Sequence, residues 1–159
     1  MSEVQAPDFG RLLAPYLARV PAEALPRFLA LLERGAADRY RFWAAELPAH
    51  AEVLLSCASS EEEIADRVDA AFALAPEHEA LIHEPLPDAR RTYEDVFAGV
   101  DVWDQLRIQA NAERQGAQAW RNLASRVTDD GIVATLGACA ALEEASADRV
   151  DALVRVHGS

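Results

Sequence analysis

Apolar residues recur at three- and four-residue intervals along most of the chain, and no run alternates apolar and polar residues in the way of a β-strand. This pattern predicts an all-α protein. A short first helix is expected from about Phe9 to Val20, with a kink at Pro15. Four long helices are expected next. The first begins near Pro21 and Pro26 and ends at about Leu47, and the others cover residues 49–72, 101–127 and 129–154.

Prolines at positions 76, 85 and 87 interrupt the periodicity between the second and third long helices. We therefore expect a connector over residues 73–101 that contains one or two short helices. A chain of 159 residues suits one domain. The predicted organisation is an N-terminal segment over residues 1–20, followed by a single helical bundle over residues 21–159.

An internal repeat is the strongest feature of the sequence. Residues 57–72 read CASSEEEIADRVDAAF and residues 139–154 read CAALEEASADRVDALV, with ten of 16 positions identical at an offset of 139 − 57 = 82. A weaker match aligns Glu33 with Glu113 at an offset of 113 − 33 = 80. Residues 102–154 are therefore predicted to duplicate residues 22–72, and two such hairpins would pack about a pseudo-twofold axis.

Each long helix carries one glutamate on its apolar stripe. These inward residues are Glu33, Glu61, Glu113 and Glu143, and the stripes place Tyr40, Trp120, Cys57 and Cys139 beside them. A buried carboxylate loses hydration free energy unless it is paired, protonated or bound to a metal, and four together repel one another. A divalent metal such as iron or manganese would remove this conflict, so the four glutamates are the candidate metal ligands.

The chain resembles the ferritin-like superfamily. The resemblance lies in the duplicated hairpins, the long crossover, and an aromatic residue seven positions after a glutamate, as in Glu33 with Tyr40 and Glu113 with Trp120. It covers about Pro21 to Val154. It implies a four-helix ferritin-like bundle with an extra N-terminal helix. It also implies a di-iron or di-manganese site in which two helices give one Glu each and two give Glu-x-x-His.

The histidines of that pattern are missing. Glu61 is followed at the third position by Ile64 and Glu143 by Ser146, and a register shifted by one residue also lacks histidine. The four histidines lie in a predicted turn, the connector and the tail (His50, His78, His83 and His157). Two interpretations stay open: the glutamates hold one or two hard cations through oxygen ligands alone, or the bundle has lost its metal and the carboxylates are satisfied by arginines or partial exposure.

The composition of the chain limits the kinds of partner that we expect it to bind. A net charge of −12 leaves no basic surface for nucleic acid or an anionic membrane, and two cysteines can build neither a disulfide scaffold nor a four-cysteine zinc site. The apolar runs are far shorter than the roughly 20 residues of a membrane span. The N-terminal sequence MSEVQAPDF lacks the features of a signal peptide, so we expect a cytoplasmic protein.

These observations favour a ferritin-like protein whose metal site is degenerate and which acts as a non-catalytic binding or interaction module, with homodimerisation through a flat helical face as one mode. The alternative is a metal-carboxylate oxidase or hydroxylase, or a metal-binding protein, that uses the four glutamates. A third interpretation is a small-molecule carrier whose core has space beside small side chains (Ala36, Ala37, Gly116 and Ala117). Cys57 and Cys139 are interpreted as small core residues, with a redox pair or soft-metal site as the alternative.

Overall fold

The computed structural model describes residues 4–158, and every regular element in that range is helical, which confirms the all-α prediction. The long helices are α2 (Leu25–Glu46), α3 (Ala51–Ala71), α6 (Val102–Ala124) and α7 (Asp130–His157). The shorter ones are α1 (Phe9–Leu17), α4 (Pro76–His83) and α5 (Leu86–Phe97), with 3-10 turns at Ala22–Ala24 and Pro48–His50. Among the described residues, no helix is both long and apolar enough to span a membrane.

The helix termini follow local capping chemistry. The Asp101 carboxylate accepts a hydrogen bond from the backbone N–H of Trp103 at 2.9 Å, and Asp129 caps α7 in the same way. α1 continues through Pro15, where a kink was expected, and ends at Leu17 instead of Val20. α7 continues three residues past the expected end at Val154, since no helix-breaking residue precedes Gly158.

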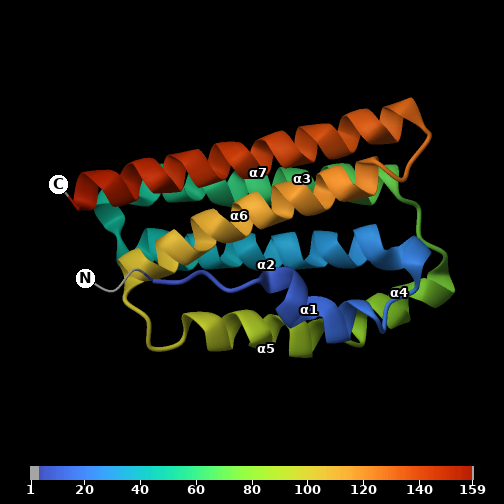
Figure 1. Cartoon of the computed structure of the whole chain (residues 1–159), viewed down its shortest axis with the longest axis horizontal. Helices are drawn as coiled ribbons and strands as arrows, with labels where there is room; N and C mark the ends of the chain where they lie inside the picture. Colours follow the sequence, from blue (N-terminus) through green and yellow to red (C-terminus); the bar gives the residue numbers. More distant parts are fainter. Residues whose placement is uncertain (1–3, 159) are drawn as a thin grey trace.

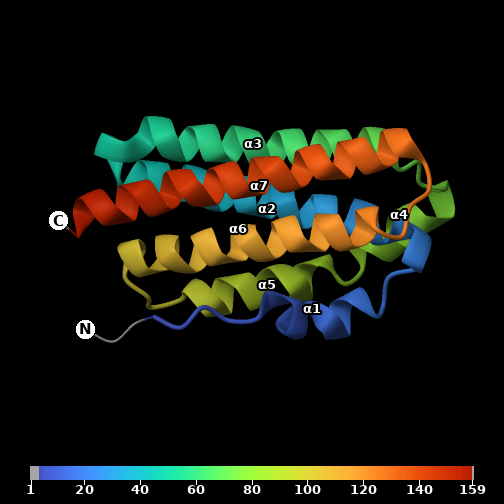
Figure 2. The same cartoon turned by 45° about the horizontal axis from the view of Figure 1, so that its top comes forward.

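The long helices form two antiparallel hairpins, α2 with α3 and α6 with α7, and α3 packs against α7. α2 and α7 run in one direction along the molecule, while α3 and α6 run in the other (Figure 1). The segment between the hairpins places α4 at one end, and α5 then returns along the length of the molecule to the start of α6 (Figure 2). The connector therefore crosses from one end of the hairpins to the other, as a single long crossover requires.

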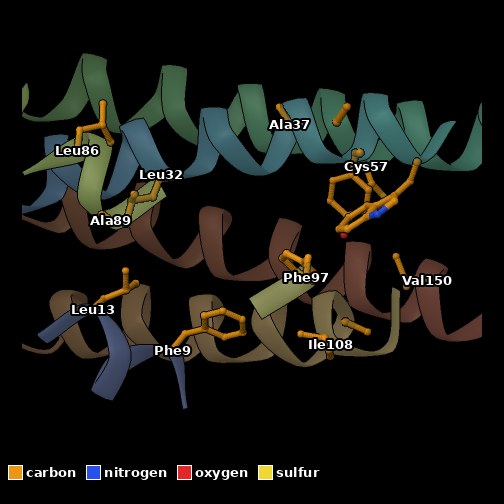
Figure 3. Packing of buried hydrophobic residues seen from close by; sticks show 14 of the residues in the cluster. Phe9, Leu13, Leu32, Ala37, Cys57, Leu86, Ala89, Phe97, Ile108 and Val150 are labelled. Atoms are coloured by element: carbon orange, nitrogen blue, oxygen red, sulfur yellow. The ribbon is translucent and has the colours of Figure 1, made fainter. Parts of the chain in front are cut away.

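The helices α1 and α5 cover the side of the molecule where α2 and α6 face each other. α5 contacts both α1 and α2, and α1 also contacts α6. The backbone N–H of Phe9 donates to Gln115 Oε1 at 2.9 Å, and Gln115 Nε2 donates to the carbonyl of Pro7 at 2.8 Å. The Phe9 ring stacks on Tyr93 of α5, and Phe9 and Phe97 belong to one buried cluster (Figure 3). Two segments outside the hairpins thus complete the core.

Corresponding ion pairs tie the two helices of each hairpin together. Arg34 of α2 lies 2.9 Å from carboxylate oxygens of both Asp66 and Asp69 on α3. Arg114 of α6 lies 3.3 Å from Asp148 and 2.6 Å from Asp151 on α7. The two arginines are 114 − 34 = 80 residues apart, and each pair of aspartates is 82 apart (148 − 66 and 151 − 69), the offsets of the sequence repeat.

A polar layer divides the buried apolar residues into two clusters. Cys57, Ala110 and Val150 belong to the cluster that also includes residues of α1 and α5. Ile64 and Cys139 belong to the second cluster, inside the hairpins. On α3, α6 and α7 the residues that separate the two clusters are the predicted inward glutamates, all buried (Glu61, Glu113 and Glu143).

Candidate metal centre

The four predicted glutamates meet in this polar layer, one from each long helix. Oxygen atoms of Glu33, Glu61 and Glu143 lie within 4.8 Å of one another, close enough for one ion to contact all three. Glu113 of α6 faces the same space and interacts electrostatically with the other three. Glu61 is 0% exposed, and Glu113 and Glu143 are 2% exposed, while Glu33 at the edge is partly exposed.

Neutral donors orient two of these carboxylates. Glu113 Oε1 accepts a hydrogen bond from the Tyr40 hydroxyl at 2.6 Å and another from Gln109 Nε2 at 2.7 Å. Glu143 Oε1 accepts one from Trp120 Nε1 at 3.0 Å. Tyr40 and Trp120 thus lie beside the glutamates, and each donates its polar hydrogen to one of them. These contacts fix the carboxylates without neutralising their charge.

Three further carboxylate oxygens of the layer have no hydrogen-bond donor in the part of the chain that the structure describes. Both oxygens of Glu61 and the Oε2 of Glu113 are buried without a hydrogen bond. Among residues 4–158, no arginine forms an ion pair with any of the four glutamates, although the charge of Arg39 lowers the pKa of Glu33, which is also partly exposed. Unpaired buried carboxylate oxygens are costly and call for either protons or a cation.

Burial and mutual repulsion raise the pKa values of three of the glutamates. The pKa of Glu33 rises to about 7, first because of burial and then because of the charge of Glu113. Burial is also the largest cause for Glu61 and Glu143, whose pKa values lie well above the usual range. After burial, the largest cause is the charge of Glu113 for the pKa of Glu61 and the charge of Glu33 for the pKa of Glu143. Without a cation, the layer therefore holds protons near neutral pH.

Gly116 of α6 leaves the space that the Glu143 carboxylate occupies. A Cβ atom at position 116 would lie 2.5 Å from Glu143 Oε1 and 2.9 Å from its Cδ, far closer than such atoms approach. The residue at the corresponding position of the first hairpin is Ala36, 80 positions earlier. The glycine in the middle of a helix therefore has a local reason, which is the close approach of a carboxylate.

The positions three residues after Glu61 and Glu143 offer no nitrogen ligand. Ile64 is fully buried in the second apolar cluster. Ser146 accepts a hydrogen bond from Arg149 Nη2 at 3.2 Å, and Arg149 also donates to Ser56 and Ser60 of α3. The histidines lie elsewhere; His157, for example, stacks on Trp103 at 3.8 Å. Carboxylates are accordingly the candidate ligands.

Cys57 and Cys139 are buried free thiols, and the structure does not bring them together. Cys57 lies one helical turn before Glu61, and Cys139 lies one turn before Glu143. Because α3 and α7 run antiparallel (Figure 1), the two cysteines lie on opposite sides of the polar layer. Cys57 therefore packs in one apolar cluster and Cys139 in the other. Burial raises the pKa of Cys139 to about 11. These properties match small core residues.

The Asp-Arg dipeptides that recur in the repeat, Asp66–Arg67 and Asp148–Arg149, form no ion pairs between the two hairpins within residues 4–158. Arg67 instead pairs with Glu63 of its own helix, and the two aspartates pair within the hairpins as described above. Arg149 crosses from α7 to α3 but donates to serines there. Arg149 and Arg67, at equivalent repeat positions, thus have different partners.

A cavity of about 360 Å³ reaches the glutamates between α2 and α6. Exposed residues such as Asp8, Gln118 and Asn122 line its outer part, and Glu113 and Glu143 line its buried end. Of the small residues expected to leave space, Ala36 and Gly116 line this cavity, whereas Ala37 and Ala117 are packed in the apolar clusters. Its other walls come from α1 and α5.

Sequence reasoning missed three residues of the site. Gln109 lies four residues before Glu113 on the same helix, a spacing that places both on one face and could have revealed it. Arg39 donates to Gln109 Oε1 at 3.4 Å, and its guanidinium lies 4.5 Å from the Tyr93 ring centre. Tyr93 comes from the connector, and no sequence signal places it there.

Comparison of the chain with models of known protein families, with curated proteins and with solved structures found no match.

Proposed function

We propose that this protein binds a divalent cation of the iron or manganese type in the glutamate layer. The ligands are carboxylate oxygens of Glu33, Glu61 and Glu143, with Glu113 beside them. The single observation that carries the proposal is Glu61, whose side chain is fully buried with both oxygens lacking a partner among the described residues. Hard divalent cations prefer oxygen ligands, so the donor set fits this class of ion.

The arrangement also supports membership of the ferritin-like superfamily with a duplicated hairpin. Three observations favour it: one glutamate from each long helix, the connector that crosses the length of the hairpins, and the ion pairs of Arg34 and Arg114 at equivalent positions. The site departs from that family's pattern because Ile64 and Ser146 stand where histidines are expected. We therefore propose a variant that binds metal through carboxylates alone.

The residues of the chain have separable roles in this proposal. Trp120 holds Glu143, and Tyr40 and Gln109 hold Glu113, so that the carboxylates keep their positions before a cation arrives. The apolar clusters bury the layer on both sides, and the cavity between α2 and α6 leads to it from outside. When bound, a divalent metal would neutralise the carboxylates and provide a Lewis-acid or redox centre. Oxidase or hydroxylase activity depends on this binding, as does any role in metal storage.

The test is elemental analysis of the purified protein after loading with iron or manganese under reducing conditions. Wild type is expected to retain one or two equivalents. A Glu61→Gln, Glu143→Gln double variant is expected to retain less than a tenth of that, since neutral amides are weak ligands and keep the shape of the side chains. Glu63→Gln is the matched control, because Glu63 is exposed on the same helix two residues from Glu61.

Wild-type protein that stays free of metal after loading would refute the proposal. In that case the degenerate bundle without metal, acting as an interaction module, becomes the better account, and the carboxylates hold protons instead. Loss of metal by Glu63→Gln to the same extent as by the double variant would also contradict it, because the bound metal would then lie on the surface. Circular dichroism of each variant checks that the helices are intact.

A further inference from the structure

We infer that the cavity between α2 and α6 binds a small apolar molecule that carries a positively charged nitrogen, with the nitrogen against Glu113. The inference rests on the proposed function in one respect, which is that the metal takes Glu33, Glu61 and Glu143 and leaves Glu113 available. The cavity, its charge and its unsatisfied acceptor each point to this class of ligand.

The size and lining of the cavity suit a small organic molecule. Its volume of about 360 Å³ is within the range of small-molecule sites and equals the liquid volume of about 12 water molecules. Much of the wall is apolar and comes from four helices, for example Leu13 of α1, Leu29 and Leu32 of α2, and Ala112 of α6. An apolar molecular body is therefore favoured along most of its length.

The unsatisfied hydrogen-bonding capacity at the buried end is that of an acceptor. Glu113 is 2% exposed, and its Oε2 has no partner within the described residues. Gln109 Nε2 already donates to Glu113 Oε1 and Trp120 Nε1 to Glu143, and the buried donor of the lining that has no partner among the described residues, Arg39 Nε, does not donate to Glu113. A ligand that reaches this end must consequently supply the donor itself, and an ammonium group supplies one with a charge.

The charge of the wall selects a cation over an anion. Four acidic side chains (Asp8, Glu33, Glu113 and Glu143) line the cavity, against one cationic side chain, Arg39, within the part of the chain described by the structure. Glu33 and Glu143 hold protons or the proposed metal, so Asp8 and Glu113 are the two acidic groups left to meet a ligand cation. Arg39 is itself held by Gln109 and by the face of Tyr93. The rings of Phe9, Tyr93 and Trp120 also line the cavity, and since Tyr93 already stacks on Phe9 and lies under the Arg39 guanidinium, they contribute apolar wall.

The experiment is isothermal titration calorimetry with three probes of similar shape: 2-phenylethylamine, the neutral 2-phenylethanol and the anionic phenylacetate. Each is titrated into metal-loaded and metal-free protein at pH 7.5. The amine is expected to bind at least tenfold more tightly than the alcohol, and phenylacetate not measurably. Glu113→Gln should reduce the affinity for the amine at least tenfold and leave that for the alcohol within threefold, because the amide keeps the shape of the side chain and removes its negative charge.

A second variant tests the place of binding without touching a carboxylate. Ala112→Leu adds bulk to the cavity wall at a partly exposed position of α6 and should weaken the amine and the alcohol alike, by at least fivefold. The matched control is Ala134→Leu, an exposed position of α7 that does not line the cavity, and it should change neither affinity.

Equal affinities for amine and alcohol would overturn the inference, and so would full amine binding by Ala112→Leu. Displacement of the amine by metal would overturn it as well, since the two cations would then compete for one set of carboxylates. Metal uptake with no amine binding refutes this inference alone. Amine binding by a protein that takes up no metal refutes the proposed function alone, because Glu113 and the cavity do not need the metal to exist.

Discussion

The close approach of Gly116 to Glu143 allows a sharp test of how the glutamate layer is built. Gly116→Ala normally stabilises a helix interior by about 0.5–1 kcal/mol, because alanine restricts the unfolded chain and favours the helix. Here the added Cβ would lie 2.5 Å from Glu143 Oε1. The carboxylate is 2% exposed and can shift only toward the adjoining cavity, and we expect this shift to break its hydrogen bond to Trp120 at 3.0 Å.

The magnitude follows from these opposing contributions. Forcing an extra carbon into a packed site costs about 1–3 kcal/mol, and losing the hydrogen bond between Trp120 and protonated Glu143 costs about 0.5–1.5 kcal/mol. After the gain in helix propensity is subtracted, and because the carboxylate can relax in part, we expect a net destabilisation of about 1–3 kcal/mol. For a protein of this size the melting temperature should fall by roughly 2–12 °C. Retained metal should fall at least tenfold.

Thermal unfolding followed by circular dichroism, together with elemental analysis, measures both effects. Gly137→Ala is the matched control, because Gly137 is exposed within α7 and an added Cβ there meets no atom within 4 Å. That control should raise the melting temperature by roughly 1–4 °C and leave metal content unchanged. If Gly116→Ala stabilises the protein as much as Gly137→Ala and binds metal normally, the described position of Glu143 is wrong.

Two further predictions concern the same layer. The pKa of Glu33 rises from 4.5 to about 7 on folding, so between these pH values the folded state binds a proton that the unfolded state lacks. The free energy of unfolding of the metal-free protein should therefore fall by up to about 3 kcal/mol from this residue as the pH rises from 4.5 through 7. Denaturant unfolding at pH 5 and pH 8 should show this difference in wild type and a smaller one in Glu33→Gln, and equal pH dependence of the two proteins would contradict the assignment. Tyr40→Phe removes the donor 2.6 Å from Glu113 Oε1 and should destabilise the protein by about 1–2 kcal/mol, measured by chemical denaturation. A change below about 0.3 kcal/mol would show that Gln109 alone satisfies this oxygen.

Much of the helical architecture was predictable because its signals are local. Apolar periodicity and the caps at Asp101 and Asp129 placed the long helices to within a few residues. The four glutamates were predictable for the same reason, since each lies on an apolar stripe where a charge is unexpected. The predicted ends of α1 and α7 were less accurate than this, because several residues near Leu17 and His157 were compatible with either helix or turn.

The partners of the glutamates depended on contacts between distant segments. Trp120 donates to Glu143 of its own hairpin, whereas Tyr40, its counterpart in the repeat, donates across to Glu113. A repeat alone would have placed the two rings in equivalent contacts. The contribution of Tyr93 required knowledge of how the connector lies against α2, which no periodicity reveals. The separation of the cysteines followed from the antiparallel course of two helices and could have been deduced from topology.

The placement of α1 and α5 has a consequence for how such a protein can change over evolutionary time. The carboxylates belong to the four long helices, whereas Leu13, Leu17 and Tyr93 of the cavity wall belong to segments outside the repeat. Substitutions in these outer segments can reshape the cavity and leave the glutamate layer intact. Under the proposals made above, selectivity for an organic ligand and retention of the glutamate layer can thus diverge independently, and each can be redesigned in the laboratory without rebuilding the other.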